Sequence, residues 1–167
     1  MIDVGHGITF VGSGTPASPN TVRLGGRVSG NFVTVTVLLG GPTTSTDIYG
    51  FAFDLVMDSS DVVELTPLSA GPALRQLSGC ESIEFLSRQS GNRIVVGITK
   101  VGWCDGNGID AGEEVIATYS YRAFVPGRTT LRFDGPPGGS GPSAYDSNGN
   151  VIDTIVFDTG TATIVTE

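Results

Sequence analysis

Apolar and polar residues alternate along most of the chain, a period that is typical of β-strands with one buried face. The alternation is clearest over residues 32–37, where Val recurs at every second position between Phe and Thr. It continues over residues 50–57, where Phe51, Phe53 and Leu55 share one face. Similar runs cover residues 94–99, 115–121 and 131–133, and shorter strands are expected at 21–24, 63–68, 82–86 and 161–165.

Turn-forming residues separate these runs, with Gly-Gly-Pro at 40–42 and Ser-Asn-Gly-Asn at 147–150 as clear examples. No segment has a convincing helical period with caps. About nine strands joined by tight turns predict an all-β fold, a nine-stranded antiparallel β-sandwich with jelly-roll topology. We expect one domain over residues 19–167, preceded by a flexible lead-in over residues 1–18 that is rich in Gly, Ser and Pro.

Charge and hydropathy disfavour several classes of partner. The chain has 167 residues, of which 39% are hydrophobic, which is enough for a single core. Its formal net charge of −8 disfavours binding to nucleic acid or to anionic membranes. No apolar stretch approaches the roughly 20 residues that a membrane-spanning helix needs, so no membrane insertion of this segment is expected.

The usual catalytic groups are missing. The one histidine, His6, lies in the predicted lead-in, where it cannot be held in the geometry that proton transfer requires. No pattern in the sequence makes two carboxylates converge as a glycosidase needs. We therefore expect a protein that is not an enzyme and that needs no cofactor.

Two cysteines, Cys80 and Cys104, lie far apart and lack the neighbours of a zinc site. A disulfide between them is favoured over two reduced thiols, would stabilise the fold by roughly 3.5 kcal/mol, and indicates an oxidising compartment. Trp103 is expected to pack on this disulfide, and an exposed Trp103 that stacks on a sugar is the alternative.

One segment has oxygen donors at alternating positions, as calcium loops do. Calcium binds six to eight oxygens, and the twelfth position counted from Asp146 is Phe157 rather than the Glu of an EF-hand. Asp and Asn also favour tight turns, so a structural turn is preferred and calcium is the alternative. The candidate calcium ligands are Asp146, Asn148, Asn150 and Asp153.

Several segments, taken in order, resemble the cohesin family. Residues 49–58 carry a Gly, alternating aromatics and a terminal Asp, as the cohesin consensus does, and the short strand at 62–65 follows. Residues 93–99 and 114–123 resemble the sixth and seventh strands of cohesins, and 144–152 with 160–165 resemble the final loop and strand. The chain departs from the family at 57–59, where Met-Asp-Ser replaces a frequent Tyr-Asp-Pro, and in its cysteine pair.

The resemblance implies a non-catalytic sandwich that binds a dockerin, a small calcium-loaded helical module, on one sheet face. In the family this face comprises strands three, five, six and eight. Strand parity then places ten candidate residues outward, with Asp54 and Arg132 as the charges expected to matter most. They are Ala52, Asp54, Val56, Glu84, Leu86, Val95, Gly97, Thr99, Thr130 and Arg132. For any one of them, an ordinary solvated sheet face is the alternative.

The expected function is docking of a dockerin-like module or another surface protein, in an extracellular, cell-surface or periplasmic location. A carbohydrate-binding module is one alternative, in which Trp103 or Tyr145 lines a groove for a polysaccharide. A structural or adhesive spacer within a larger cell-surface protein is another.

Overall fold

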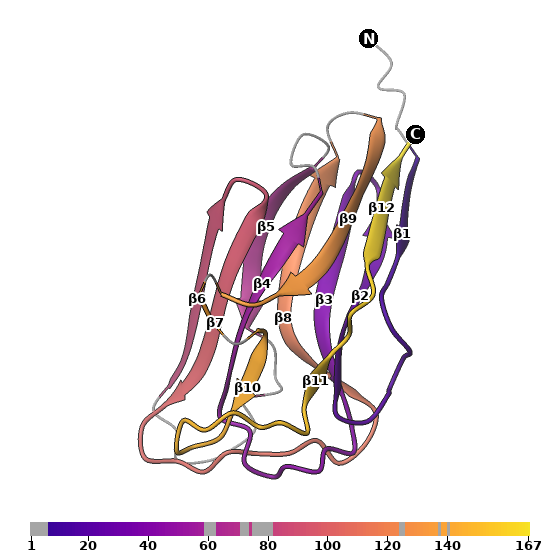
Figure 1. The fold of residues 1–167 in the computed structure, drawn as a ribbon. Helices are drawn as coiled ribbons and strands as arrows, with labels where there is room; N and C mark the ends of the chain where they lie inside the picture. The colour runs from indigo at the N-terminus through magenta and orange to yellow at the C-terminus, as the bar shows by residue number, and fades with distance from the viewer. Residues whose placement is uncertain are drawn as a thin grey trace.

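Two β-sheets pack face to face in the computed structural model, which describes residues 7–58, 63–70, 74, 82–123, 126–136, 138–139 and 141–167 (Figure 1). Residues 63–70 and Ala123 are described through their backbone. Within these ranges, no helix is long and apolar enough to cross a membrane.

The first sheet, here called sheet A, has the strand order β1-β12-β9-β4-β7-β6, with β10 paired to β4. Its strands are β1 (Ile8–Val11), β4 (Gly50–Met57), β6 (Ser82–Ser90), β7 (Arg93–Val101), β9 (Gly127–Asp134), β10 (Ser143–Tyr145) and β12 (Ala162–Thr166). The second, sheet B, has the order β11-β2-β3-β8-β5. It contains β2 (Thr21–Ser29), β3 (Phe32–Gly40), β5 (Val63–Ala70), β8 (Glu113–Ala123) and β11 (Val156–Phe157).

The core lies between the sheets and follows the alternation in the sequence. Val33, Val35 and Val37 point inward from β3 and are buried, as are Phe53 and Leu55 on β4. Phe53 packs edge-on against Phe133 of β9, with ring centroids 5.6 Å apart, a geometry that aromatic pairs prefer. The predicted all-β sandwich is confirmed.

The structure has short strands that the sequence analysis did not predict. Strand β1 lies inside the expected lead-in, yet it pairs with β12, and Ile8 and Phe10 pack against the core. Strand β11 runs parallel to β2, so the sheets are not entirely antiparallel. These strands and β10 have two to four residues each, which is too short for an alternating pattern to stand out.

Candidate functional site

The outer face of sheet A brings the predicted binding residues together. Strand register places them in rows that cross β6, β7, β4 and then β10 or β9. The middle row contains Leu86, Gly97, Ala52 and Ser143. The row on one side contains Glu84, Thr99, Gly50 and Tyr145, and the row on the other contains Arg88, Val95, Asp54 and Asp134. Beyond Arg88 lies a fourth row of Ser90, Arg93, Val56 and Arg132.

A groove of about 530 Å³ runs over the middle and Glu84 rows. Gly97 and Gly50 contribute to its floor, and Leu86, which is 72% exposed, lies on its β6 side. The opposite wall is the loop that runs from Tyr145 to Gly149. The sheet A face is therefore hollowed rather than level.

Glycine occupies the two floor positions for different reasons. A Cβ atom on Gly50 would lie 2.8 Å from the carbonyl oxygen of Ile98, so the packing of the sheet requires glycine there. A Cβ atom on Gly97 would meet nothing within 4 Å, and the backbone of Gly97 is not in the left-handed region. No contact within the described chain therefore explains why Gly97 lacks a side chain.

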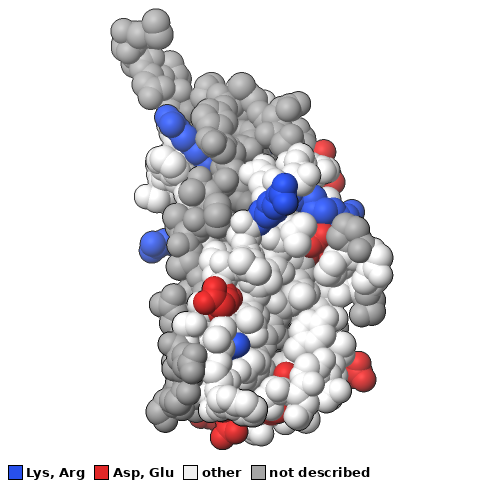
Figure 2. Space-filling model, turned by 90° about the vertical axis from the view of Figure 1, so that its left-hand side faces the viewer, with Lys and Arg blue, Asp and Glu red and all other residues white. Residues whose placement is uncertain are grey.

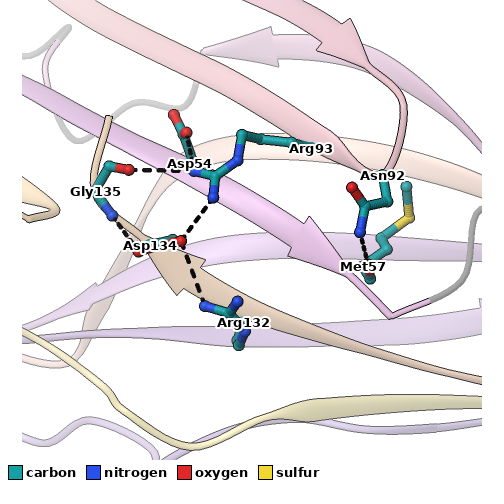
Figure 3. A network of polar contacts seen from close by, with 7 residues as sticks. All are labelled: Asp54, Met57, Asn92, Arg93, Arg132, Asp134 and Gly135. Atoms are coloured by element: carbon teal, nitrogen blue, oxygen red, sulfur yellow. Dashed lines mark hydrogen bonds and ion pairs between the residues drawn. The ribbon is translucent and has the colours of Figure 1, made fainter. Parts of the chain in front are cut away.

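Asp54 is fully buried, and the prediction that it offers a surface charge is wrong. It lies on the outward side of β4, but Arg93 Nη1 of β7 covers it and donates to its Oδ2 at 2.5 Å (Figure 3). Arg93 Nη2 also donates to Asp134 Oδ2 at 2.8 Å, which lowers the pKa of the Asp134 carboxyl. Asp54 is thus part of an ion-pair cluster that ties β4, β7 and β9 together.

Val56 is also buried, at 8% exposure, because its row neighbours are the long side chains of Arg93 and Arg132. The other predicted residues differ in exposure. Ala52, Gly97 and Thr130 are half-buried, while Glu84, Leu86, Val95, Thr99 and Arg132 are exposed.

The sequence analysis missed Arg88, which shares the parity of Glu84 and Leu86, because it ended the strand at residue 86 instead of Ser90.

The loop wall of the groove is fixed by two carboxylates. Asp47 Oδ2 accepts hydrogen bonds from Ser147 Oγ at 2.8 Å and from its backbone N–H, and Asp47 Oδ1 accepts one from the Gly106 N–H. Asp146 Oδ2 accepts the side-chain amide of Asn150 at 3.1 Å, and its Oδ1 accepts the backbone N–H groups of Asn150 and Asn148. These bonds lower the pKa of the Asp146 carboxyl.

The same bonds bear on the calcium alternative. Asp146 uses its carboxylate to close the turn, while Asn148, Asn150 and Asp153 are exposed. In the described part of the chain, no three His, Cys, Asp or Glu side chains are grouped as a metal site requires. The hydrogen bonds of Asp146 form the predicted turn, and calcium binding by this loop stays an alternative prediction.

Trp103 is fully exposed, so the expectation that it packs on a disulfide is wrong. The loop that carries Trp103 is held beside the groove. Tyr49 lines the groove, and its hydroxyl donates a hydrogen bond to the Gly102 carbonyl at 2.8 Å. Cys80 lies outside the described residues, so its disulfide with Cys104 stays a prediction.

Comparison with known proteins identifies the fold. No protein-family model matches the chain, and no curated protein matches it. The second type II cohesin module of the cellulosomal adaptor ScaA scaffoldin of Acetivibrio cellulolyticus is 14% identical, with a TM-score of 0.58 over 96% of this chain and 97% of that one. The seventh ScaB type I cohesin of Pseudobacteroides cellulosolvens is 20% identical, with a TM-score of 0.56 over 84% and 88%.

A third similar structure is a type I cohesin–dockerin complex from Clostridium thermocellum. Its matching chain is 17% identical, with a TM-score of 0.55 over 92% of this chain and 96% of that one. The resemblance seen in the sequence is confirmed at the level of the fold: the chain has the fold of cohesin modules.

Proposed function

We propose that this domain is a non-catalytic protein-binding module that takes a dockerin-like helical module on the sheet A face. The observation that carries the proposal is the open floor at Gly97. A glycine inside a strand costs roughly 0.5–1 kcal/mol relative to alanine, and it is often found where a ligand or another backbone approaches closely. Since the fold does not require this glycine, a partner that lies in the groove is the best explanation for it.

The dimensions of the groove suit a helix. From one wall to the other, the groove spans three strand-to-strand intervals, from β6 through β7 and β4 to β10. At roughly 4.8 Å for each interval, the walls are about 14 Å apart. A helix with its side chains is about 10–12 Å across. Leu86 and Val95 supply exposed apolar contacts, and Glu84 and Arg132 supply a polar rim, which is the usual composition of a protein interface.

The comparisons support a partner of this kind by analogy. The similar structures include complexes of a cohesin with a dockerin-containing partner, among them one from Acetivibrio cellulolyticus and one from Clostridium thermocellum. Binding would rest on steric fit and a few charged hydrogen bonds, with no bond made or broken. An extracellular, cell-surface or periplasmic location fits this function and the predicted disulfide.

Calorimetric titration with the dockerin partners of those two complexes tests the proposal. The unmodified domain should bind at least one of these dockerins. A control variant, Thr9→Arg, should do so as well, because Thr9 is exposed on β1, at the edge of sheet A opposite to β6. Gly97→Arg should abolish that binding, because its side chain fills the groove. The proposal fails if neither dockerin binds the unmodified domain, or if Gly97→Arg binds as tightly as Thr9→Arg.

A carbohydrate-binding function is the second candidate, because Trp103 is fully exposed and Tyr49 and Tyr145 line the groove. Aromatic rings of this kind can stack on sugars. The chain has one tryptophan, so titration with soluble glycans should change the Trp103 fluorescence if this function holds. An unchanged spectrum across a glycan panel would eliminate it.

A further inference from the structure

We propose that the groove selects a bipolar partner, whose helical segment carries basic side chains at one end and acidic side chains at the other. This inference rests on the proposed function, because it names the chemistry of the partner that the sheet A face accepts. It is argued from the charges that the rows of this face leave exposed.

Strand β6 shows the polarity most directly. Every second residue of this strand points outward, and the outward residues Glu84, Leu86 and Arg88 are all exposed. Four residues of strand separate the acid from the base, a distance of about 14 Å. In the described part of the chain, the ion pairs involve neither Glu84 nor Arg88, so both charges are available to a partner.

The Arg88 end has an excess of basic residues: the two rows at this end hold three arginines, Arg88, Arg93 and Arg132, against two aspartates, Asp54 and Asp134, a net charge of 3 − 2 = +1. Arg93 binds both Asp54 and Asp134. Arg132 lies 3.6 Å from Asp134, but its side chain is 45% exposed. Arg88 and Arg132 therefore present positive charge on either side of this cluster. Asp58, one position beyond β4, is exposed and accepts a hydrogen bond from the Thr130 hydroxyl, so its negative charge lies outside these two rows.

The Glu84 end is acidic. Glu84 and Asp146 line opposite walls of the groove, so each wall carries a carboxylate. The nearby base, Lys100, points inward, is 2% exposed and donates to the Asp105 carbonyl. Figure 2, viewed from the β6 side, shows Lys and Arg mainly in the upper half, together with some Asp and Glu, and most of the other Asp and Glu in the lower half.

The separation of the two ends determines the partner. The Debye length at physiological salt is about 8 Å, which is shorter than the roughly 14 Å between Glu84 and Arg88, so each end acts largely on its own. A uniformly charged helix is attracted at one end and repelled at the other. A helix with Lys or Arg about nine residues from Asp or Glu, at 1.5 Å per residue, matches both ends.

Three stapled helical peptides of about 14 residues with the same Leu and Ala face provide the probes. One carries two Lys at one end and two Glu at the other, one carries four Lys, and one carries four Glu. In fluorescence anisotropy at 150 mM NaCl, the domain should bind the bipolar peptide at least about threefold more tightly than either uniform peptide. Glu84→Arg should come to prefer the four-Glu peptide, and Arg88→Glu the four-Lys peptide.

Each outcome decides the inference. It is overturned if the bipolar peptide has no advantage, if the ranking is the same in both variants, or if no peptide binds. Gly97→Arg separates this failure from that of the proposed function. If Gly97→Arg abolishes binding but the charge variants leave the ranking unchanged, groove docking stands and the bipolar inference falls. If the peptides bind Gly97→Arg normally, they do not occupy the groove, and the proposed function loses its support.

Discussion

The two sheets each carry a groove on their outer face, and the glycines beneath the two grooves differ. The sheet B groove, about 600 Å³, lies over β2 and β3 and is the larger one. A Cβ atom on Gly26 would lie 2.6 Å from the Thr34 carbonyl oxygen and 2.8 Å from the Phe10 ring. A Cβ atom on Gly25 would lie 2.7 Å from Leu38. Gly26 is therefore needed where Phe10 of β1 packs over β2, while Gly25 meets the end of the flexible Leu38 side chain, and Gly97 beneath the sheet A groove is free of such contacts.

This comparison shows that the size of a groove does not identify a binding site. The larger groove lies where Phe10 of β1 packs over β2, and its Gly26 cannot accept a side chain. The smaller groove has one floor position, Gly97, that could accept a side chain and does not have one. The proposed function therefore rests on the sheet A groove.

The largest expected effect is at the ion-pair cluster beside the sheet A groove. Arg93→Met keeps a long side chain over Asp54 but removes the positive charge that pairs with it, so it should lower the free energy of unfolding more than any other change below. Arg132→Ala removes an exposed pair and should cost less than about 1 kcal/mol. Urea denaturation measures both, and equal losses would show that Arg93 does not hold the cluster together.

The glycines should respond in opposite directions. Gly26→Ala should destabilise the fold by about 2 kcal/mol, because its methyl group meets a backbone carbonyl. Gly97→Ala should stabilise the fold by about 0.5–1 kcal/mol, because it has room and restricts the unfolded chain. Thermal unfolding of the two variants side by side gives the answer, and a loss of stability in Gly97→Ala would contradict the open floor.

A smaller, pH-dependent effect is expected under the sheet B groove. Arg23 Nε and Nη2 donate to the two carboxylate oxygens of Glu113 at 2.5 and 2.7 Å, which lowers the pKa of Glu113 from its usual 4.5. A lowered folded-state pKa adds stability above the unfolded pKa, and this stability is lost as the pH falls through the folded pKa. Unfolding of Glu113→Gln between pH 2 and 6 should therefore depend less on pH than that of the unmodified domain. Parallel curves would remove Glu113 from the account.

The smallest expected effect on stability is at Trp103. Because its side chain is fully exposed, Trp103→Ala should change the free energy of unfolding by less than about 0.5 kcal/mol. In the unmodified domain, acrylamide should readily quench the fluorescence of this single tryptophan. A protected fluorophore or a large loss of stability would mean that Trp103 is packed.

The sequence predicted those parts of the structure that depend on local alternation. The long strands and the shared face of Leu86, Gly97 and Ala52 follow from period-two patterns and from the resemblance to cohesins. The burial of Asp54 did not follow, because it depends on Arg93 and Asp134, which are distant in the sequence and meet only when β7 and β9 flank β4. The exposure of Trp103 was missed for a similar reason, since its neighbours are set by the path of a loop.

The most direct test of the central claim is a series at residue 97 in which both thermal stability and dockerin affinity are measured. Ala, Val and Arg at this position add increasing volume to the floor of the groove. We predict that the melting temperature stays level or rises through the series while the affinity falls stepwise to nothing. A falling melting temperature with unchanged affinity would show that Gly97 serves the fold and that the partner binds elsewhere.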